Sequence, residues 1–102
     1  MSSPFATEVL TIGAAATSLT ASKYARRHGN EATEALATLE PGTGRIRFYY
    51  DGSVPTAMDG HIMDPGDVLT LESLAEISKF QGIRTGGVSG TLTVTYGSGP
   101  GG

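Results

Sequence analysis

The sequence predicts an all-β protein, either a small antiparallel β-sandwich or a jelly-roll-like barrel, with at most one short helical turn. Short stretches in which apolar and polar residues alternate recur along the chain, separated by turn signals at intervals of about ten residues. Charged residues make up 17% of the sequence, below the roughly 25% of a typical soluble domain. Many polar positions are instead Thr, Ser and Gly, which suit strands and tight turns. Such alternation also argues against a doubly wound parallel sheet.

The length of 102 residues fits a single domain, residues 1–102, with a thin core. The ends, residues 1–5 and 97–102, are rich in glycine, serine and proline, and we expect them to be flexible. The sequence has no cysteine, which excludes disulfides, thiolate metal sites and cysteine nucleophiles and fits a protein that folds in a reducing cytoplasm.

The first predicted strand covers residues 6–13, where Leu10 and Ile12 share a face with Glu8 and alternate with Val9 and Thr11.

Residues 31–40 are compatible with two structures. Their Ala, Leu and Glu content favours a helix, whereas the alternation of Leu36 and Thr38 with Ala35 and Ala37 favours a strand. We expect the strand.

Residues 45–50 give the strongest strand signal, because aromatic and β-branched residues alternate there with arginines. The pattern puts Ile46, Phe48 and Tyr50 in the core and leaves Tyr49 outward. Three neighbouring aromatic residues could form a platform for a sugar ring, but this alternation leaves only one of them available.

The rest of the chain predicts an irregular segment over residues 51–66 and then three more strands. We expect these strands at residues 68–72, 80–85 and 90–96, and either one helical turn or a strand edge at residues 74–79.

No motif predicts an enzyme, a metal site or a cofactor site. The sequence has two histidines, His28 and His61, and lacks both a Gly-x-Ser-x-Gly motif and a phosphate-binding loop. Aspartates near His61 could hold a cation, but they fit no EF-hand spacing and suit turns better. We therefore predict no catalytic residues, no metal and no cofactor.

Candidate interface residues are Phe5, Lys23, Arg26, Arg27 and Tyr49. Three of them belong to the basic cluster at residues 23–28, which could contact phosphate or an acidic neighbour. Because the net charge is −3, we consider binding of this cluster to nucleic acid unlikely. No apolar run approaches the ~18 residues of a membrane span, so we expect no membrane partner.

Residues 45–61 resemble a recurring pattern in small virion-associated proteins of tailed phages, of the head-decoration and head–tail accessory type. In that pattern an arginine-containing strand is followed by Asp-Gly, here Asp51 and Gly52, then by Pro-Thr starting at Pro55, and then by Gly-His ending at His61. The resemblance continues through a Gly-Asp pair and an apolar strand to a Thr/Val strand that ends in Tyr96, and it covers about residues 35–96.

The resemblance implies a structural component of a phage virion, made in the host cytoplasm. It would be a capsid decoration or minor head protein that binds the major capsid lattice, or a protein of the head–tail junction with neck or tail partners. The alternative is a carbohydrate- or receptor-binding module on the particle surface. Because the predicted core is thin, we expect a homo-oligomer, a trimer or a ring.

Four residues of the pattern are expected to build a structural loop. Asp51 and Gly52 would turn the chain out of the strand, Pro55 would fix the loop, and His61 would form a hydrogen bond across it.

Overall fold

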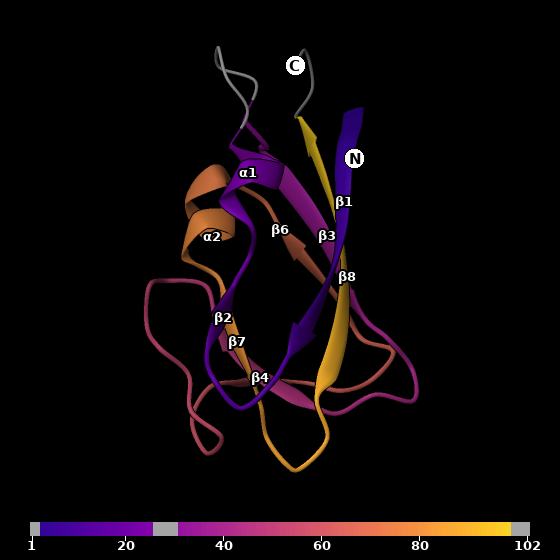
Figure 1. The fold of residues 1–102 in the computed structure, drawn as a ribbon. Helices are drawn as coiled ribbons and strands as arrows, with labels where there is room; N and C mark the ends of the chain where they lie inside the picture. The colour runs from indigo at the N-terminus through magenta and orange to yellow at the C-terminus, as the bar shows by residue number, and fades with distance from the viewer. Residues whose placement is uncertain (1–2, 26–30, 99–102) are drawn as a thin grey trace.

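The computed structural model describes residues 3–25 and 31–98. These residues form two four-stranded antiparallel sheets that face each other across a hydrophobic core (Figure 1). The predicted small all-β sandwich is confirmed. The first sheet has the strand order β1 (Ser3–Ile12), β8 (Gly90–Ser98), β3 (Glu34–Leu39), β6 (Val68–Leu71).

The second sheet is smaller, and its strand order is β2 (Thr17–Ser18), β7 (Gln81–Arg84), β4 (Ile46–Tyr49), β5 (His61–Met63). The segment at residues 31–40 is therefore largely a strand, as expected. β2 and β5 were not predicted, since β2 has only two residues and β5 lies in the segment expected to be irregular.

Two short helices, α1 (Ala21–Tyr24) and α2 (Leu74–Lys79), lie toward the end of the sandwich that carries the chain termini (Figure 1). Ser73 is the N-cap of α2, and its side chain accepts a hydrogen bond from the backbone N–H of Glu76. Its Ile77 is fully buried. The helical alternative for residues 74–79 is thus the correct one, and α1 is an addition that the sequence did not predict.

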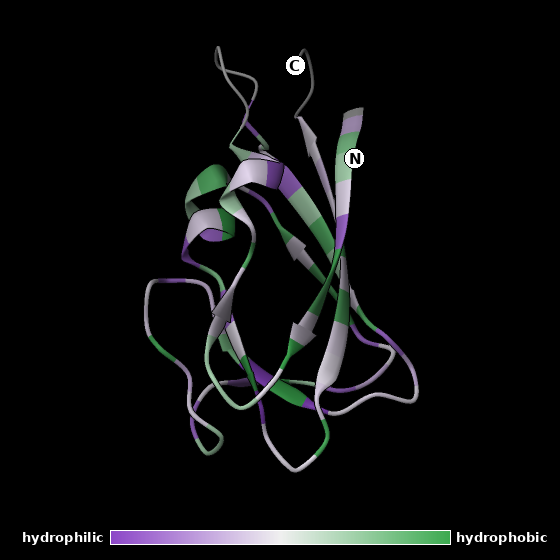
Figure 2. Ribbon diagram, viewed as in Figure 1, coloured by the Kyte–Doolittle hydropathy of each residue, from purple (hydrophilic) through white to green (hydrophobic). Residues whose placement is uncertain are grey.

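The core is built from the inward-facing residues of the strands, which are every second residue along each strand. Leu92, Val94 and Tyr96 of β8 are all completely buried, and the threonines between them are partly exposed. In β3 burial alternates although hydropathy does not, because Leu36 is exposed between two buried alanines and all three residues are hydrophobic (Figure 2). This period of two is what a sheet requires when one face lies against a core and the other faces solvent.

One predicted core position is wrong. Ile46 and Phe48 are buried as expected, but Tyr50 is 37% exposed. The reason is that β4 ends at Tyr49, so the alternation no longer fixes the direction of the next side chain.

Part of the chain ends that we expected to be flexible forms strand pairs. Ser3 pairs with Ser98 and Pro4 with Gly97, so the two ends of the described chain lie side by side as neighbouring strands. A register shift between Pro4 and Ala6 accommodates the proline, which has no N–H to donate. Residues 1–2 and 99–102 lie outside the described residues.

Candidate functional site

The segment between β4 and β5, residues 50–60, is termed here the β4–β5 loop. It contains Asp51, Gly52 and Pro55, and it is flanked by Tyr49 and His61. The structure thus brings all four predicted loop residues and one predicted interface residue together.

The loop begins with a local turn. The Asp51 carboxylate accepts a hydrogen bond from the backbone N–H of Ser53 at 2.9 Å, and this bond holds the pKa of Asp51 below its ordinary value because it stabilises the charged form. Gly52 has a φ of 94°, which favours glycine. Pro55 is fully buried and anchors the loop on the sandwich.

The tip of the loop is a tight turn around Met58. Thr56 and Asp59 exchange backbone hydrogen bonds of 2.9 and 3.1 Å. The backbone N–H of Met58 donates to the Thr56 hydroxyl oxygen at 3.2 Å. The turn leaves the Met58 side chain 86% exposed.

Two side chains of β4 hold the loop against the outer side of the second sheet. Arg47 donates from Nε to the carbonyl oxygen of Ala57 at 3.1 Å and from Nη1 to that of Gly60 at 2.9 Å. The Tyr49 hydroxyl donates to Asp59 Oδ1 at 2.8 Å. This bond, together with the negative charge of Asp59, raises the pKa of Tyr49 above its ordinary value.

His61 packs among aromatic rings. Its ring centroid lies 5.5 Å from Phe48, 5.5 Å from Tyr49 and 6.3 Å from Tyr50. No hydrogen bond joins the His61 side chain to another described residue, so the expected hydrogen bond across the loop is wrong. Its position follows from β5, where His61 pairs in register with Phe48.

The loop and β5 together expose a group of large apolar side chains, termed here the loop patch. Its members are Tyr50 (37% exposed), Val54 (60%), Met58 (86%) and Ile62 (47%). The hydrogen bonds described above fix the backbone between them. This combination of exposed apolar side chains and a fixed backbone suits binding of another protein.

The remaining predicted interface residues lie elsewhere. Phe5 and Lys23 line one shallow, open depression formed by the start of β1 and by α1. In Figure 1, α1 lies near the end with the termini, whereas the β4–β5 loop lies toward the other end. Arg26 and Arg27 lie outside the described residues.

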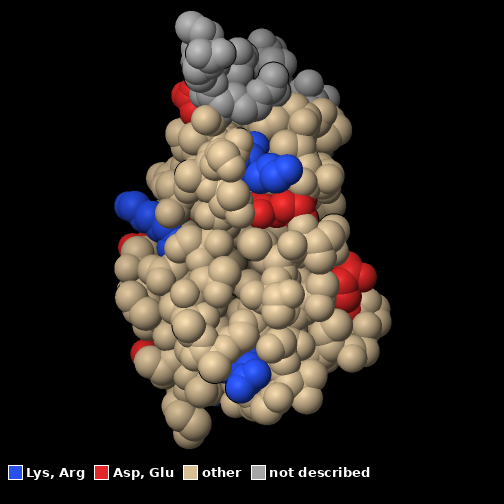
Figure 3. All heavy atoms as spheres, viewed as in Figure 1, with Lys and Arg blue, Asp and Glu red and all other residues tan. Residues whose placement is uncertain are grey.

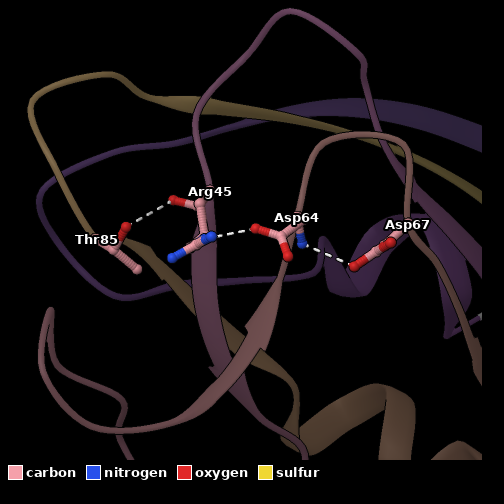
Figure 4. A network of polar contacts seen from close by, with 4 residues as sticks. All are labelled: Arg45, Asp64, Asp67 and Thr85. Atoms are coloured by element: carbon pink, nitrogen blue, oxygen red, sulfur yellow. Dashed lines mark hydrogen bonds and ion pairs between the residues drawn. The ribbon is translucent and has the colours of Figure 1, made fainter.

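A polar network joins three segments at the ends of their strands (Figure 4). Arg45 Nε lies 2.5 Å from Asp64 Oδ1 and forms an ion pair with it. The Asp67 carboxylate accepts a hydrogen bond from the Asp64 backbone N–H at 2.8 Å. The Thr85 hydroxyl donates to the Arg45 carbonyl oxygen at 3.4 Å. The side chains of the ion pair are about half exposed, so the pair contributes at most about 1 kcal/mol. The network is structural.

Within residues 3–25 and 31–98, no group of three His, Asp or Glu residues is arranged to hold a metal ion. No helix in the same part of the chain is long and apolar enough to cross a membrane. The face shown in Figure 3 carries only scattered charged side chains on a wide uncharged surface.

Sequence reasoning missed Arg47, Asp59 and Met58 as parts of the site. The outward position of Arg47 was visible in the alternation of β4, but its partners depend on how the loop folds back. Met58 gave no signal, because a single methionine in a loop is not a pattern.

No family model, no curated protein and no solved structure matches this chain. The assignment of function therefore depends on the residues and geometry described above.

Proposed function

We propose that this protein is a non-enzymatic structural component of a tailed-phage virion, a capsid decoration or minor head protein that binds the capsid lattice or the head–tail junction. The observation that carries this proposal is the loop patch, in which Met58 and Val54 stand exposed on a loop with a fixed backbone.

The energetics of the loop favour docking. Met58 at 86% exposure contributes almost no burial to the free protein, whereas full burial of such a side chain is worth about 1.5–3 kcal/mol. Because Arg47 and Tyr49 already hold the backbone, little conformational entropy is lost on binding. Methionine is also enriched at protein interfaces and adapts to irregular surfaces.

The choice of a phage particle comes from the sequence pattern. The part that most resembles small tailed-phage proteins, residues 45–61, is the part that forms β4, the β4–β5 loop and the first residue of β5. The protein is made in the host bacterial cytoplasm and functions in the virion, where neighbouring capsid, neck or tail subunits cover the loop patch.

Binding to particles tests the proposal. Purified protein is mixed with particles that lack its gene product, and the bound fraction is measured by co-sedimentation. Wild-type protein should bind saturably, and Met58→Glu should lose binding by about tenfold or more because it buries a charge.

The matched control for that experiment is Val88→Glu, which puts the same charge on another exposed apolar side chain, 63% exposed and outside the loop patch. It should bind like wild type. Equal binding by Met58→Glu and wild type, or no binding by wild type, would contradict the proposal.

A second candidate is a carbohydrate- or receptor-binding module on the particle surface. The observation that favours it is that the exposed rings of Tyr50 and His61 lie beside each other and near Asp51 and Asp59. Aromatic faces stack on sugar rings, and carboxylates accept hydrogen bonds from sugar hydroxyls. In that case Tyr50→Ala would abolish binding to host surface polysaccharide, and Met58→Glu would leave it intact.

A further inference from the structure

β1 forms one edge of the first sheet and has no strand on its outer side among the described residues. It has ten residues, whereas the other edge strands, β6, β5 and β2, have four, three and two. An edge strand carries a row of backbone N–H and C=O groups that no neighbouring strand satisfies. The outer side of β1 is therefore the longest row of this kind in the described part of the chain.

The hydrogen bonds of the neighbouring strands identify the residues that carry this row. In an antiparallel sheet the N–H and C=O of one residue point to the same neighbouring strand, and successive residues point to opposite sides. The Thr91 carbonyl oxygen accepts a hydrogen bond from the backbone N–H of Glu40 at 2.8 Å, one residue beyond the pair Leu39 and Leu92. Thr91 therefore points to the β3 side of β8, and the even-numbered residues from Leu92 to Tyr96 point to β1.

The register transfers this alternation to β1. Its even-numbered residues from Ala6 to Leu10 lie opposite the β8 residues that point to β1, so they form the hydrogen bonds between the two strands. Thr7, Val9 and Thr11 point the other way, and no backbone hydrogen bond joins their outward groups to another described residue. All three side chains are exposed. We term these three residues the free edge of β1.

The shallow depression that Phe5 and Lys23 line lies beside the start of the free edge. Its lining consists of the four consecutive residues from Pro4 to Thr7, and of Lys23. Because successive side chains of a strand point to opposite faces, four consecutive lining residues place the depression along the side of β1 and not on one face of the sheet. α1, which carries Lys23, packs beside β1 and forms the opposite wall (Figure 1).

The lining of the depression carries a positive charge. Lys23 is exposed, and its ammonium group forms no ion pair within residues 3–25 and 31–98. The charged residue of β1 itself, Glu8, faces inward, where Thr20 and the Tyr96 hydroxyl donate hydrogen bonds to its carboxylate. Lys23 therefore offers a cation beside the free edge, and Glu8 is already satisfied.

We propose that β1 is a strand-addition site, on which an extended segment of another protein pairs with the free edge and places an Asp or Glu side chain at Lys23. The proposal does not rest on the particle role proposed above, and it concerns a surface separate from the loop patch.

The chemistry of the free edge selects this occupant. Its residues alternate along the strand, so their N–H and C=O groups recur about every 6.6 Å, which is the spacing at which another extended backbone presents its own groups. Val9 is 67% exposed and can pack against a β-branched side chain of the added strand. A second copy of β1 fits less well, because its carboxylate, that of Glu8, is engaged inward and does not reach Lys23.

Amide hydrogen exchange of the free protein tests the assignment of the free edge without any substitution. The amides of Glu8 and Leu10 should exchange slowly, because they are bonded to β8. The amide of Val9, which lies between them in the same strand, should exchange at least about tenfold faster. Equal protection of Val9 and Leu10 would overturn the proposal.

The probe for binding is a ribosome-displayed library of random peptides of about twelve residues, selected on immobilised wild-type protein. Peptides that bind wild type but not Val9→Pro are retained, because proline removes the Val9 N–H and leaves the hydrogen bonds between β1 and β8 in place. The retained peptides should carry β-branched residues at alternate positions and an Asp or Glu. Melting curves establish that Val9→Pro folds, and Thr7→Pro replaces it in the selection if it does not.

A retained peptide should slow amide exchange of the free edge in the wild-type protein by about tenfold. The control variant is Val9→Thr, which keeps the N–H and a β-branched side chain and should bind the peptide within about twofold of wild type. A selection that yields no such peptide, or a peptide that protects a different surface, would overturn the proposal.

Lys23→Glu tests the charge of the occupant. It should weaken binding of an acidic retained peptide by about fivefold, and a peptide in which lysine replaces the acidic residue should regain that loss on Lys23→Glu. Equal binding of the acidic peptide to wild type and to Lys23→Glu would contradict the placement of a carboxylate at Lys23.

Two further outcomes separate this proposal from its alternatives. Met58→Glu should bind the retained peptides like wild type, so a failure of particle binding and a failure of strand addition are distinguishable. Protection of the free edge that appears when the concentration of the protein alone is raised would show that a second copy occupies it. That result would overturn the assignment of the site to another protein.

Discussion

The hydroxyl of Tyr96 donates a hydrogen bond to the carboxylate of Glu8, which lies 88 residues earlier in the chain. Tyr96 is completely buried, and Glu8 is partly buried. The same carboxylate accepts hydrogen bonds from the backbone N–H of Thr20 at 3.1 Å and from its hydroxyl at 2.5 Å. Glu8 therefore joins β1, β8 and the N-cap residue of α1. The ring centroids of Tyr96 and Tyr24 lie 5.8 Å apart.

This relationship predicts that Tyr96→Phe lowers the free energy of unfolding by about 1.5–3 kcal/mol, because a hydrogen bond to a carboxylate is lost at a partly buried site. Urea unfolding at neutral pH measures the change. Tyr50→Phe is the matched control, because it removes a hydroxyl from an exposed tyrosine. We expect its free energy of unfolding to stay within about 0.5 kcal/mol of the wild-type value. Equal effects of the two substitutions would remove the role assigned to Glu8.

Stability at alkaline pH should depend on the same tyrosine. Burial, and then the hydrogen bond to Glu8, raise the pKa of Tyr96 above its ordinary value of 10.0. A raised pKa gives a contribution that is fully present below pH 10 and is lost as pH rises toward the folded-state pKa. Above pH 10, wild-type stability should therefore fall more steeply than that of Tyr96→Phe. Parallel stability curves for the two proteins would contradict this.

Arg47 should determine the order of the β4–β5 loop. Replacement by alanine removes the hydrogen bonds to Ala57 and Gly60 and should lower the free energy of unfolding by about 1 kcal/mol. It should also speed amide exchange and proteolysis within residues 51–60.

Arg45→Ala is the control for that variant, because it removes only a half-exposed ion pair with Asp64. We expect no faster cleavage of the β4–β5 loop in Arg45→Ala. Equal cleavage of both variants would show that Arg47 does not hold the loop.

Gly60→Ala tests how closely the loop approaches the sheet. Gly60 has a φ of 142°, and a Cβ there would lie 3.1 Å from Arg47 Cβ and 3.2 Å from the Phe48 backbone nitrogen. Strain of this kind should lower stability by about 1–3 kcal/mol. Gly86→Ala, where a Cβ meets nothing within 4 Å, should change it by less than about 0.5 kcal/mol. Thermal melts of the two variants provide the comparison.

The sequence predicted the parts of the fold in which local pattern and burial agree. In β4 and β8 the outward residues differ in character from the inward ones, so the period of two was visible without tertiary information. β2 has two residues and α1 has four, which is too short for any periodicity to be detected. The pairing of Ser3 with Ser98 joins residues from the two ends of the chain, and no local pattern contains it.

The candidate site was predicted only in part. The turn chemistry of Asp51 and Gly52 could be inferred because it is local. The aromatic surroundings of His61 depend on the register between β4 and β5, and the exposure of Met58 depends on a bridge between Thr56 and Asp59. Neither follows from residue types alone.

The central claim, that this protein is a structural component of a phage particle, is tested most directly by quantitative mass spectrometry of gradient-purified particles of the phage that we propose as its source. The account predicts that the chain is present in many copies, at a fixed ratio to the major capsid or neck protein. It also predicts that a phage encoding Met58→Glu yields particles depleted of the chain by about tenfold, whereas Val88→Glu does not. Particles that lack the wild-type chain would contradict the account.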